Sequence, residues 1–473
     1  MGEPHKFSKK KVAFIHPDLG IGGAERLVVD AAVGLQELGC VVKVYTSHCD
    51  RTHCFEEVSN NVLDVEVYGD FFPTNILKKF HILFAILRQF YLALALVFTG
   101  EIKKYDYFVV DQLSFCIPIL RFFGRPESRI LFYCHFPDQL LVQKGGILKK
   151  IYRLPFDMVE EWTTGISDRV VVNSNFTKGV FRSTFKSLAS VSTGVIYPCV
   201  DLSSSIDDEE DKNVSGVVKN YFKDHRYFIS VNRYERKKYV DLAVRAFAKF
   251  KDNLDTTKAP KPLLVIAGGY DLRVRENVDY LTDLEELAKS LGLKTSTFKG
   301  GLNASSDDQE TPDVIFLLSI KTSLKKALIK NSELLLYTPS FEHFGIVPVE
   351  SMLYKTPVLA ANNGGPLESI VNYDSGNINT ATGYTVDPNE NKWADIITLH
   401  YTSDGEYKEK MGANGYNRVE QIFSRREMSQ QFYENLKQSE SSSMNKGILY
   451  KLLTQWKLYS LFTIVLIISR LMA

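Results

Sequence analysis

The sequence predicts an α/β protein made of two doubly wound, Rossmann-like domains. The chain has 473 residues, which is long enough for two domains with separate cores. Short apolar runs typical of buried parallel strands recur along it, and helical patterns separate them. A polar, acidic stretch divides these runs into two sets, which indicates two domains rather than one continuous sheet.

The first domain is predicted over residues 1–200. It opens with a strand at 11–16, a glycine-rich turn, a helix ending near Gly39 and a strand at 41–45. This order is a βαβ unit, which implies a parallel sheet. The remaining strands of the domain are predicted at 107–110, 130–133, 169–172 and 195–197.

Residues 201–225 are predicted to link the domains, because they are rich in serine and aspartate. The second domain is predicted over 226–440. Its strands are expected at 227–231, 263–267, 314–317, 334–337 and 357–360. Ligands of doubly wound sheets bind outside the carboxyl ends of the strands, so we expect a ligand in a cleft that the two domains face.

Bulk composition narrows the class of protein. The net charge is +1, which gives no electrostatic argument for binding nucleic acid. The six cysteines include no C-x-x-C pair, so neither a zinc site nor a dithiol motif is indicated. Scattered, reduced cysteines and an N-terminus without the apolar core of a signal peptide fit a chain that faces the cytosol.

The segment 339–350 carries the strongest functional signal. Glu342 and Glu350 stand with seven residues between them, on either side of a Phe-Gly turn. An apolar strand precedes the turn, and Pro348 suits the first turn of a helix. Free backbone N–H groups around Gly345 would then form an anion site at the positive end of the helix dipole. With Glu350 expected in the first helical turn, the pair could hold a nucleotide sugar.

Five further residues follow predicted strands. Gly22 and Gly23 open the first helix, where a glycine pair allows a close approach of ligand or simply makes a tight turn. His135 follows the strand at 130–133, either as a site residue or as a structural histidine. Arg233 and Lys238 follow the first strand of the second domain; they could meet a diphosphate or belong to a solvated charge run.

Taken together, these segments resemble the retaining GT-B glycosyltransferases. Within them they are similar to the GDP-mannose-dependent mannosyltransferases of the dolichol-linked oligosaccharide pathway. The likeness spans about residues 10–440 and rests on the stretches 14–30, 133–138, 195–201, 267–271, 341–350 and 362–368. It implies the GT-B fold, with a final helix near 426–438 returning to the first domain.

The resemblance also implies a reaction and a set of residues. Mannose would pass from GDP-mannose to mannosyl-chitobiosyl-diphosphodolichol in two transfers, α-1,3 and α-1,6, with retained configuration. The implied catalytic residues are His135, Arg233, Lys238 and Glu342. The implied donor-binding residues are Gly22, Gly23, Phe344, Gly345, Ile346 and Glu350. Arg233 and Lys238 would neutralise the departing GDP, Glu350 would hold the ribose and Glu342 the mannose.

Neither a cofactor nor a bound metal is expected, since basic residues and a helix N-terminus would supply the positive charge. The lipid acceptor implies the cytosolic face of the endoplasmic reticulum membrane, with other glycosyltransferases of the pathway as candidate partners and no nucleic acid. Residues 82–99 are predicted to form a helix that lies on the membrane or lines the entrance for the lipid, with a packed core helix as the alternative. Residues 446–473 are predicted to form an apolar membrane-associated tail that either spans the membrane or lies in its interface. Two other readings stay open: a nucleotide-sugar epimerase or phosphorylase, and a non-catalytic scaffold.

Overall fold

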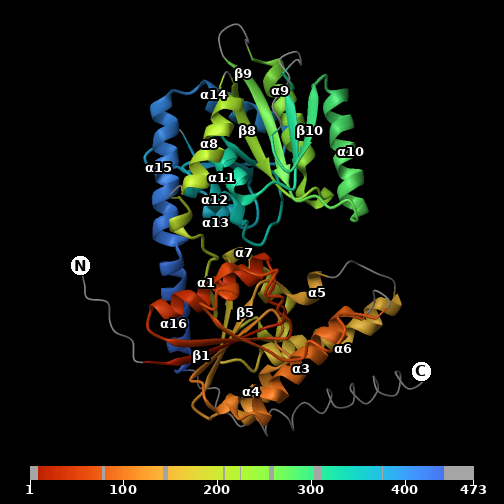
Figure 1. The fold of residues 1–473 in the computed structure, drawn as a ribbon, viewed down its shortest axis with the longest axis vertical. Helices are drawn as coiled ribbons and strands as arrows, with labels where there is room; N and C mark the ends of the chain where they lie inside the picture. The colour runs from red at the N-terminus through yellow and green to blue at the C-terminus, as the bar shows by residue number, and fades with distance from the viewer. Residues whose placement is uncertain are drawn as a thin grey trace. The chain divides into compact units, whose positions relative to one another are not determined.

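A computed structural model describes residues 9–76, 80–141, 147–205, 208–223, 225–254, 260–302, 311–374 and 376–441. The chain forms two compact units (Figure 1). Unit 1 comprises Met1–Cys199 and Arg425–Ala473, and unit 2 comprises Val200–Ser424. Each unit is built around one seven-stranded sheet. Within each sheet, every pair of neighbouring strands is parallel.

The sheet of unit 1 has the order β3-β2-β1-β4-β5-β6-β7. Its strands are β1 (Lys11–His16), β2 (Val41–Thr46), β3 (Asp64–Val67), β4 (Tyr107–Asp111), β5 (Arg129–Cys134), β6 (Arg169–Val172) and β7 (Thr193–Val195). Its helices are α1 (Gly23–Glu37), α2 (Glu56–Ser59), α3 (His81–Phe98), α4 (Ile117–Phe123), α5 (Asp138–Leu141), α6 (Ile147–Thr164), α7 (Asn175–Thr184) and α16 (Arg425–Ser439), with 3₁₀ turns η1 (Glu101–Lys103) and η2 (Lys186–Leu188).

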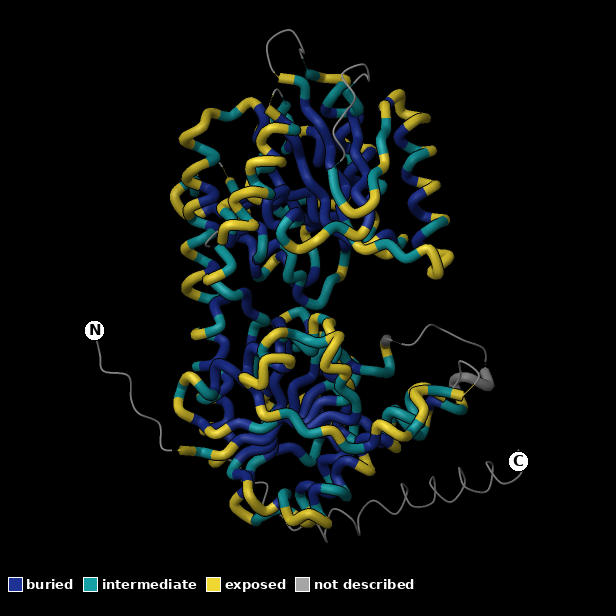
Figure 2. The backbone as a smooth tube through the Cα atoms, in the orientation of Figure 1, coloured by how far each residue is buried: buried dark blue, intermediate teal, exposed yellow. Residues whose placement is uncertain are grey.

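Helices cover both faces of this sheet, which explains why its central strands are apolar throughout. Side chains alternate between the faces of a strand. Val12 and Phe14 of β1 belong to a core shared with α1 and α16, whereas Ala13 and Ile15 belong to a second core shared with α3, α4 and α7. The strands consequently appear as buried layers in Figure 2.

The sheet of unit 2 has the order β10-β11-β9-β8-β12-β13-β14. Its strands are β8 (His225–Val231), β9 (Lys261–Gly268), β10 (Thr295–Lys299), β11 (Val314–Leu318), β12 (Leu335–Tyr337), β13 (Val358–Ala361) and β14 (Gly383–Val386). Its helices are α8 (Glu209–Tyr221), α9 (Val240–Asp252), α10 (Arg275–Ser290), α11 (Thr322–Lys330), α12 (Ile346–Leu353), α13 (Pro366–Ser369), α14 (Glu390–Thr402) and α15 (Gly405–Ile422), with 3₁₀ turns η3 (Leu202–Ser205) and η4 (Arg236–Lys238).

The prediction of two doubly wound α/β domains is confirmed, and its errors lie at the sheet edges. Three edge strands, β3, β10 and β14, were not predicted. The fourth edge strand, β7, lies at Thr193–Val195 and not at 195–197. Edge strands are partly solvated, so they lack the continuous apolar run that marks a central strand.

The stretch 201–225, predicted as a linker, is mostly helix α8 of unit 2. Its acidic residues form the helix start: the Asp208 carboxylate accepts a hydrogen bond from the Asp211 backbone N–H at 2.7 Å. Asp211 in turn pairs with Lys326 of α11, which attaches α8 to unit 2. The last described helix, α16, returns to unit 1 and packs against α1. The predicted tail, 446–473, lies outside the described residues.

Candidate functional site

The candidate site in unit 2 lies where the strand order reverses. From β8 the chain adds strands on one side of the sheet, then returns to add β12 on the other side. The loops that leave β8 and β12 therefore diverge at the carboxyl ends of two neighbouring strands, the usual place for a ligand in such sheets. Arg233 and Lys238 follow β8, and Glu342 follows β12.

Lys238 and Glu342 form an ion pair across this reversal point. The Lys238 ammonium contacts the Glu342 carboxylate, and both side chains are only partly exposed. The Thr338 hydroxyl, at the end of β12, donates to the Lys238 carbonyl oxygen at 2.6 Å. One hydrogen bond to the backbone and one ion pair thus join the two loops. They bring together a cation and a carboxylate that are distant in sequence.

The loop after β12 takes a constrained path around Glu342. Phe341 and Gly345 both have left-handed backbone conformations, with φ of 57° and 83°. A side chain at Gly345 would also approach the Tyr337 hydroxyl to 2.9 Å. Strain of this kind at a non-glycine residue persists only where the surroundings impose it, and it is frequent at ligand sites.

The turn after β13 braces this loop. The Gly365 N–H donates to the Glu342 carbonyl at 2.8 Å, and the Asn363 side-chain oxygen accepts from the Phe341 N–H at 2.5 Å. At Gly364 a Cβ atom would lie 2.6 Å from the Glu342 carbonyl oxygen, so only glycine fits there. The segment 362–365, part of one of the stretches on which the family resemblance rests, therefore holds the loop around Glu342 in place.

Glu350 lies one position further into α12 than the sequence suggested. The helix begins at Ile346, with Gly345 as its N-cap, so Glu350 is in the second turn rather than the first. Its carboxylate is held by Lys325 of α11, whose ammonium lies 2.9 Å from both oxygens. Lys325 was not predicted as a site residue, because nothing in the neighbouring sequence distinguishes it from the other lysines of α11.

Phe344 does not present its side chain to a ligand. The ring is buried and packs against Phe423 with a centroid distance of 5.7 Å. Phe344 anchors the loop in the core, so a donor contact from it would have to come from the backbone. Gly345 and Ile346, in contrast, stand at the start of α12, where the first N–H groups of a helix have no partner within the helix.

Arg233 is an exposed cation of the candidate site in unit 2. Its side chain is 73% exposed, and its guanidinium is 3.9 Å from the Glu235 carboxylate. Its neighbours hold the backbone from both sides: the Tyr234 hydroxyl donates to the Ile266 carbonyl at 3.0 Å, and Gly268 packs directly on the Asn232 carbonyl. A rigid backbone with a solvent-accessible guanidinium suits recognition of a phosphate.

In unit 1, Gly22 is the N-cap of α1 and Gly23 its first residue. A Cβ at Gly22 would meet the end of the Glu25 side chain, whereas one at Gly23 would have no atom within 4 Å among the described residues. Packing within unit 1 therefore does not require glycine at position 23. Both glycines remain proposed donor-binding residues.

His135 stands one residue after β5, beside two residues that the sequence analysis did not assign. Its Nε2 lies 2.7 Å from Asp111 Oδ1, at the end of β4, and the other carboxylate oxygen of Asp111 accepts from His16 Nδ1 at 2.7 Å. Burial alone would raise the pKa of Asp111, but the charge of His135 and the contacts of both imidazoles lower it to about 2. His16 and Asp111 are the last residues of β1 and β4. This position at the carboxyl end of a strand was the signal that could have revealed them.

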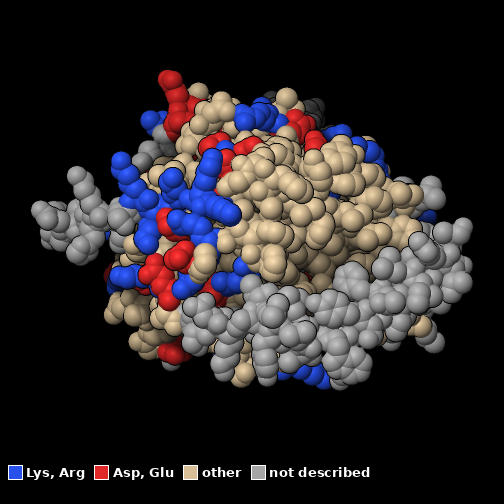
Figure 3. Space-filling model, turned by 90° about the horizontal axis from the view of Figure 1, so that it is seen from below, with Lys and Arg blue, Asp and Glu red and all other residues tan. Residues whose placement is uncertain are grey.

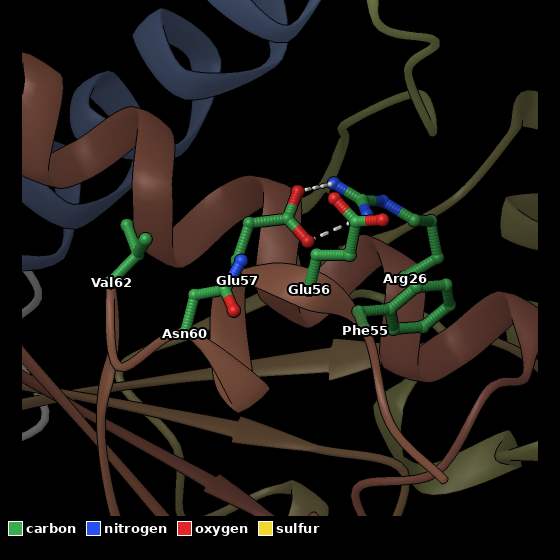
Figure 4. A pocket seen from close by; sticks show the side chains of 6 residues that line it. All are labelled: Arg26, Phe55, Glu56, Glu57, Asn60 and Val62. Carbon is green, nitrogen blue, oxygen red and sulfur yellow. Dashed lines mark hydrogen bonds and ion pairs between the residues drawn. The ribbon is translucent and has the colours of Figure 1, made fainter. Parts of the chain in front are cut away.

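A cavity of about 450 Å³ lies on unit 1 beside the first turn of α1. Its lining comprises Arg26, Phe55, Glu56, Glu57, Asn60 and Val62. Figure 4 shows the Arg26 guanidinium facing the Glu57 carboxylate, with an N–O distance of 2.7 Å, and Arg26 also pairs with Asp30. The one basic residue of the lining, Arg26, is already paired with two carboxylates, so we do not assign this cavity to the candidate site.

Comparison with protein families matches both units. The model described as Glycosyltransferase Family 4 matches residues 21–204, and the model described as Glycosyl transferases group 1 matches residues 215–310 and 305–418. Among solved structures, a glycosyltransferase from Rickettsia africae aligns over 92% of this chain and 100% of its own, with TM-score 0.65 and 17% identity. A sucrose-phosphate synthase from Thermosynechococcus elongatus also aligns with TM-score 0.65, over 92% and 100% of the two chains at 18% identity. At such identities the likeness concerns the fold.

Curated sequences give closer relatives. The chain is 63% identical to the Alpha-1,3/1,6-mannosyltransferase ALG2 of Debaryomyces hansenii, over 97% of both chains. It is 55% identical to the protein of that name in Candida albicans, over 89% of this chain and 97% of the relative. For the Saccharomyces cerevisiae protein the identity is 49%, over 90% and 84% of the two chains.

Proposed function

Because the chain belongs to the family of alpha-1,3/1,6-mannosyltransferases, we propose that it transfers mannose from GDP-mannose to a lipid-diphosphate-linked oligosaccharide. The acceptor is mannosyl-chitobiosyl-diphosphodolichol, which receives one α-1,3-linked and one α-1,6-linked mannose with retained configuration. The observation that carries the proposal is the grouping of Arg233, Lys238 and Glu342 at the reversal point of the unit 2 sheet.

The proposed chemistry places negative charge where this chain has cations. The bond between the anomeric carbon of mannose and the GDP oxygen breaks, and the diphosphate gains charge as it leaves. Arg233 and Lys238 stabilise that charge, which lowers the barrier because the attraction grows toward the transition state. The acceptor oxygen bonds the anomeric carbon on the same face, and its proton passes to the departing phosphate. No side chain is assigned as a covalent nucleophile.

The remaining residues hold the donor. Glu350, fixed by Lys325, accepts hydrogen bonds from the ribose hydroxyls, and Glu342 accepts from the mannose hydroxyls. N–H groups at the start of α12 face the diphosphate, the preferred ligand of a helix N-terminus. In unit 1 we propose that His135 contacts the donor sugar, with Gly22 and Gly23 leaving space beside the backbone.

A direct test uses the purified full chain. It is incubated with a panel of GDP-, UDP- and ADP-sugars and a lipid-diphosphate-linked chitobiose that carries one mannose, and products are read by mass. We expect gains of one and then two hexoses with GDP-mannose only, unchanged by a chelator. Lys237→Ala is the matched control for Lys238→Ala, since Lys237 is in the same turn but pairs with Glu235. Transfer from another nucleotide sugar, or none, would refute the proposal.

We also propose that the enzyme works on the cytosolic face of the endoplasmic reticulum membrane, because its acceptor is a membrane lipid. Helix α3 supports this. It is long and apolar enough to cross a membrane, but Arg88 and Gln89, in its middle, are buried. Arg88 donates to the Phe72 carbonyl at 3.0 Å and Gln89 to the Leu113 carbonyl at 2.6 Å. Apart from His81 at its first position, the exposed residues of α3 are Leu87, Phe90, Tyr91 and Phe98.

This arrangement is the reverse of an amphipathic helix on a soluble protein, which turns its polar side outward. Because Arg88 and Gln89 are bonded within unit 1, we expect α3 to lie on the membrane surface rather than span it. Seen from below the view of Figure 1, a wide area carries neither acidic nor basic side chains, and lysines and arginines gather beside it with some acidic side chains among them (Figure 3). Such a surface suits a bilayer with anionic lipid.

Flotation with vesicles of phosphatidylcholine and an anionic lipid tests this part. Replacing Leu87, Phe90 and Phe98 with serine in the full chain should lower binding about tenfold or more, since each side chain loses apolar burial. Val217→Ser, an exposed apolar residue of α8 in unit 2, is the control. The comparison is made once with residues 446–473 present and once with them deleted. Equal flotation of the triple variant and the wild type in both backgrounds would count against α3 as a membrane contact.

A further inference from the structure

Three strand ends of unit 1 place ionisable side chains in one row. β1, β4 and β5 are neighbours in the sheet, and their registers pair Ile15 with Val110 and Asp111 with Tyr133. His16, Asp111 and His135 are therefore the last residues of β1 and β4 and the first residue beyond β5. Asp111 is the middle of the three, and each of its oxygens has one imidazole nitrogen at 2.7 Å.

The three side chains differ sharply in exposure. Those of Asp111 and His16 are each 1% exposed, whereas that of His135 is 21% exposed. A buried carboxylate is costly unless cations or hydrogen-bond donors compensate it. His16 supplies a hydrogen bond through Nδ1, and its other nitrogen, Nε2, has no hydrogen-bond partner among the described residues. Among the three, only His135 can reach a ligand.

His135 and Asp111 are in close contact without a well-aligned hydrogen bond. His135 Nε2 is 2.7 Å from the Asp111 carboxylate oxygen, but it does not have the alignment of a hydrogen bond. Other acids nearby do not compete. Burial raises the pKa of the Glu160 carboxyl, on α6, to about 8, and burial also raises the pKa values of the Tyr133 hydroxyl and the Cys134 thiol. Asp111 is the ionised acid that faces His135.

We propose that Asp111 is a positioning residue for the transfer reaction: it holds the His135 ring in place, while His16 fixes the second carboxylate oxygen. His135 then turns Nδ1, the ring nitrogen that Asp111 does not contact, toward a hydroxyl of the donor sugar. What His135 contacts rests on the proposed function. The arrangement of the three residues does not, because it comes from unit 1 alone.

The first test needs no enzymatic activity. In full-length protein with ¹³C-labelled histidine, the ring signals of His135 are recorded by NMR at one fixed pH and assigned with a His135→Gln variant. We expect Asp111→Asn to shift these signals and to broaden or double them, because the ring loses the carboxylate that holds it. Asp70→Asn is the matched control, since Asp70 also contacts an imidazole, that of His48, but at an exposed position, and it should leave the His135 signals unchanged. His135 ring signals of the same position and width in Asp111→Asn and in the wild type would overturn the proposal.

The second test uses the reaction. Asp111→Asn should lower kcat by about tenfold or more with a much smaller change in the KM for GDP-mannose. Asp111→Glu, which keeps a carboxylate beside the ring, should restore part of the rate. A merely structural role would lower the melting temperature and the amount of folded protein without changing kcat per folded molecule. If the wild type transfers no mannose, the proposed function fails and the NMR comparison still decides this inference.

Discussion

In unit 2 the proposed site residues are charged side chains near solvent, whereas in unit 1 they depend on a buried carboxylate. Arg233 is mostly exposed, and the Lys238–Glu342 and Lys325–Glu350 pairs are each partly exposed. In unit 1 Asp111 and His16 are buried, and His135 alone reaches the surface. Unit 2 presents several charged side chains on loops and helices. Unit 1 presents one imidazole ring, that of His135, in contact with a buried carboxylate.

This difference has a physical consequence. Partly exposed pairs are loosely bound, so a ligand phosphate can compete for Lys238 at modest cost. The buried pair in unit 1 cannot be separated without leaving an uncompensated charge, so it acts as a fixed support. We therefore expect substitutions in unit 2 to act directly on donor binding and turnover, and substitutions behind His135 to act through the placement of its ring.

The largest effect should come from Lys238. Lys238→Ala removes a cation where the leaving diphosphate gains charge, and by analogy with the loss of an oxyanion-site donor it should cost about 3 kcal/mol or more, a rate loss of roughly two orders of magnitude. Arg233→Ala should act in the same direction. Steady-state kinetics with GDP-mannose measure the loss of turnover in both variants. Near-wild-type turnover in both variants, with Lys237→Ala also unchanged, would break the assignment of the unit 2 half.

A stability effect of comparable size should appear in unit 1 at Glu160, which is buried behind the loop that follows His135. Its carboxylate accepts from the Asp138 N–H at 2.8 Å, and burial raises its pKa to about 8. A folded-state pKa above the unfolded one favours folding at low pH and weakens it as pH rises through 8. Glu160→Gln, which stays neutral, should therefore stabilise the protein by on the order of 3 kcal/mol more at pH 8 than at pH 5.

Thermal or urea unfolding at both pH values checks this. Glu161→Gln is a suitable control, because Glu161 is the next residue on α6 and its carboxylate bonds the exposed Ser187 instead. An equal change in the free energy of unfolding in Glu160→Gln at pH 5 and pH 8 would mean that Glu160 is ionised in the folded protein. The contrast between buried acids in unit 1 and partly exposed charges in unit 2 would then be weaker.

Next in size, the two glutamates of unit 2 should separate by kinetic parameter. Glu342→Gln weakens placement of the mannose and should lower kcat by about tenfold or more, whereas Glu350→Gln weakens the ribose contact and should mainly raise the KM for the donor. Initial rates over a range of GDP-mannose concentrations distinguish them. Identical changes in both parameters for both variants would show that the two carboxylates do not have separate roles.

The sequence predicted the central strands and the unit 2 residues for the same reason: their signals are contiguous. Apolar runs mark strands buried on both faces, but β3, β10 and β14 are edge strands, with mixed sequences such as DVEV and TSTFK. The Glu342 and Glu350 segment could be read in one stretch. The contacts of Lys325 with Glu350 and of His16 with Asp111 join residues 25 and 95 positions apart, so only the folded sheet and helices reveal them.

The smallest effect should come from Lys325, which touches Glu350 rather than the proposed donor. Lys325→Met keeps the length of the side chain and removes its charge, so Glu350 loses its partner but stays in place. The loss of a partly exposed pair is worth about 1 kcal/mol or less, so we expect a rise of a few-fold in the KM for GDP-mannose with little change in kcat. Lys321→Met, at the exposed start of α11, is the control. In the double variant with Glu350→Gln the effect of Lys325→Met should disappear, because its only proposed action is through that carboxylate. Additive effects in the double variant would mean that Lys325 acts on the donor directly, and the unit 2 half would then hold a third cation.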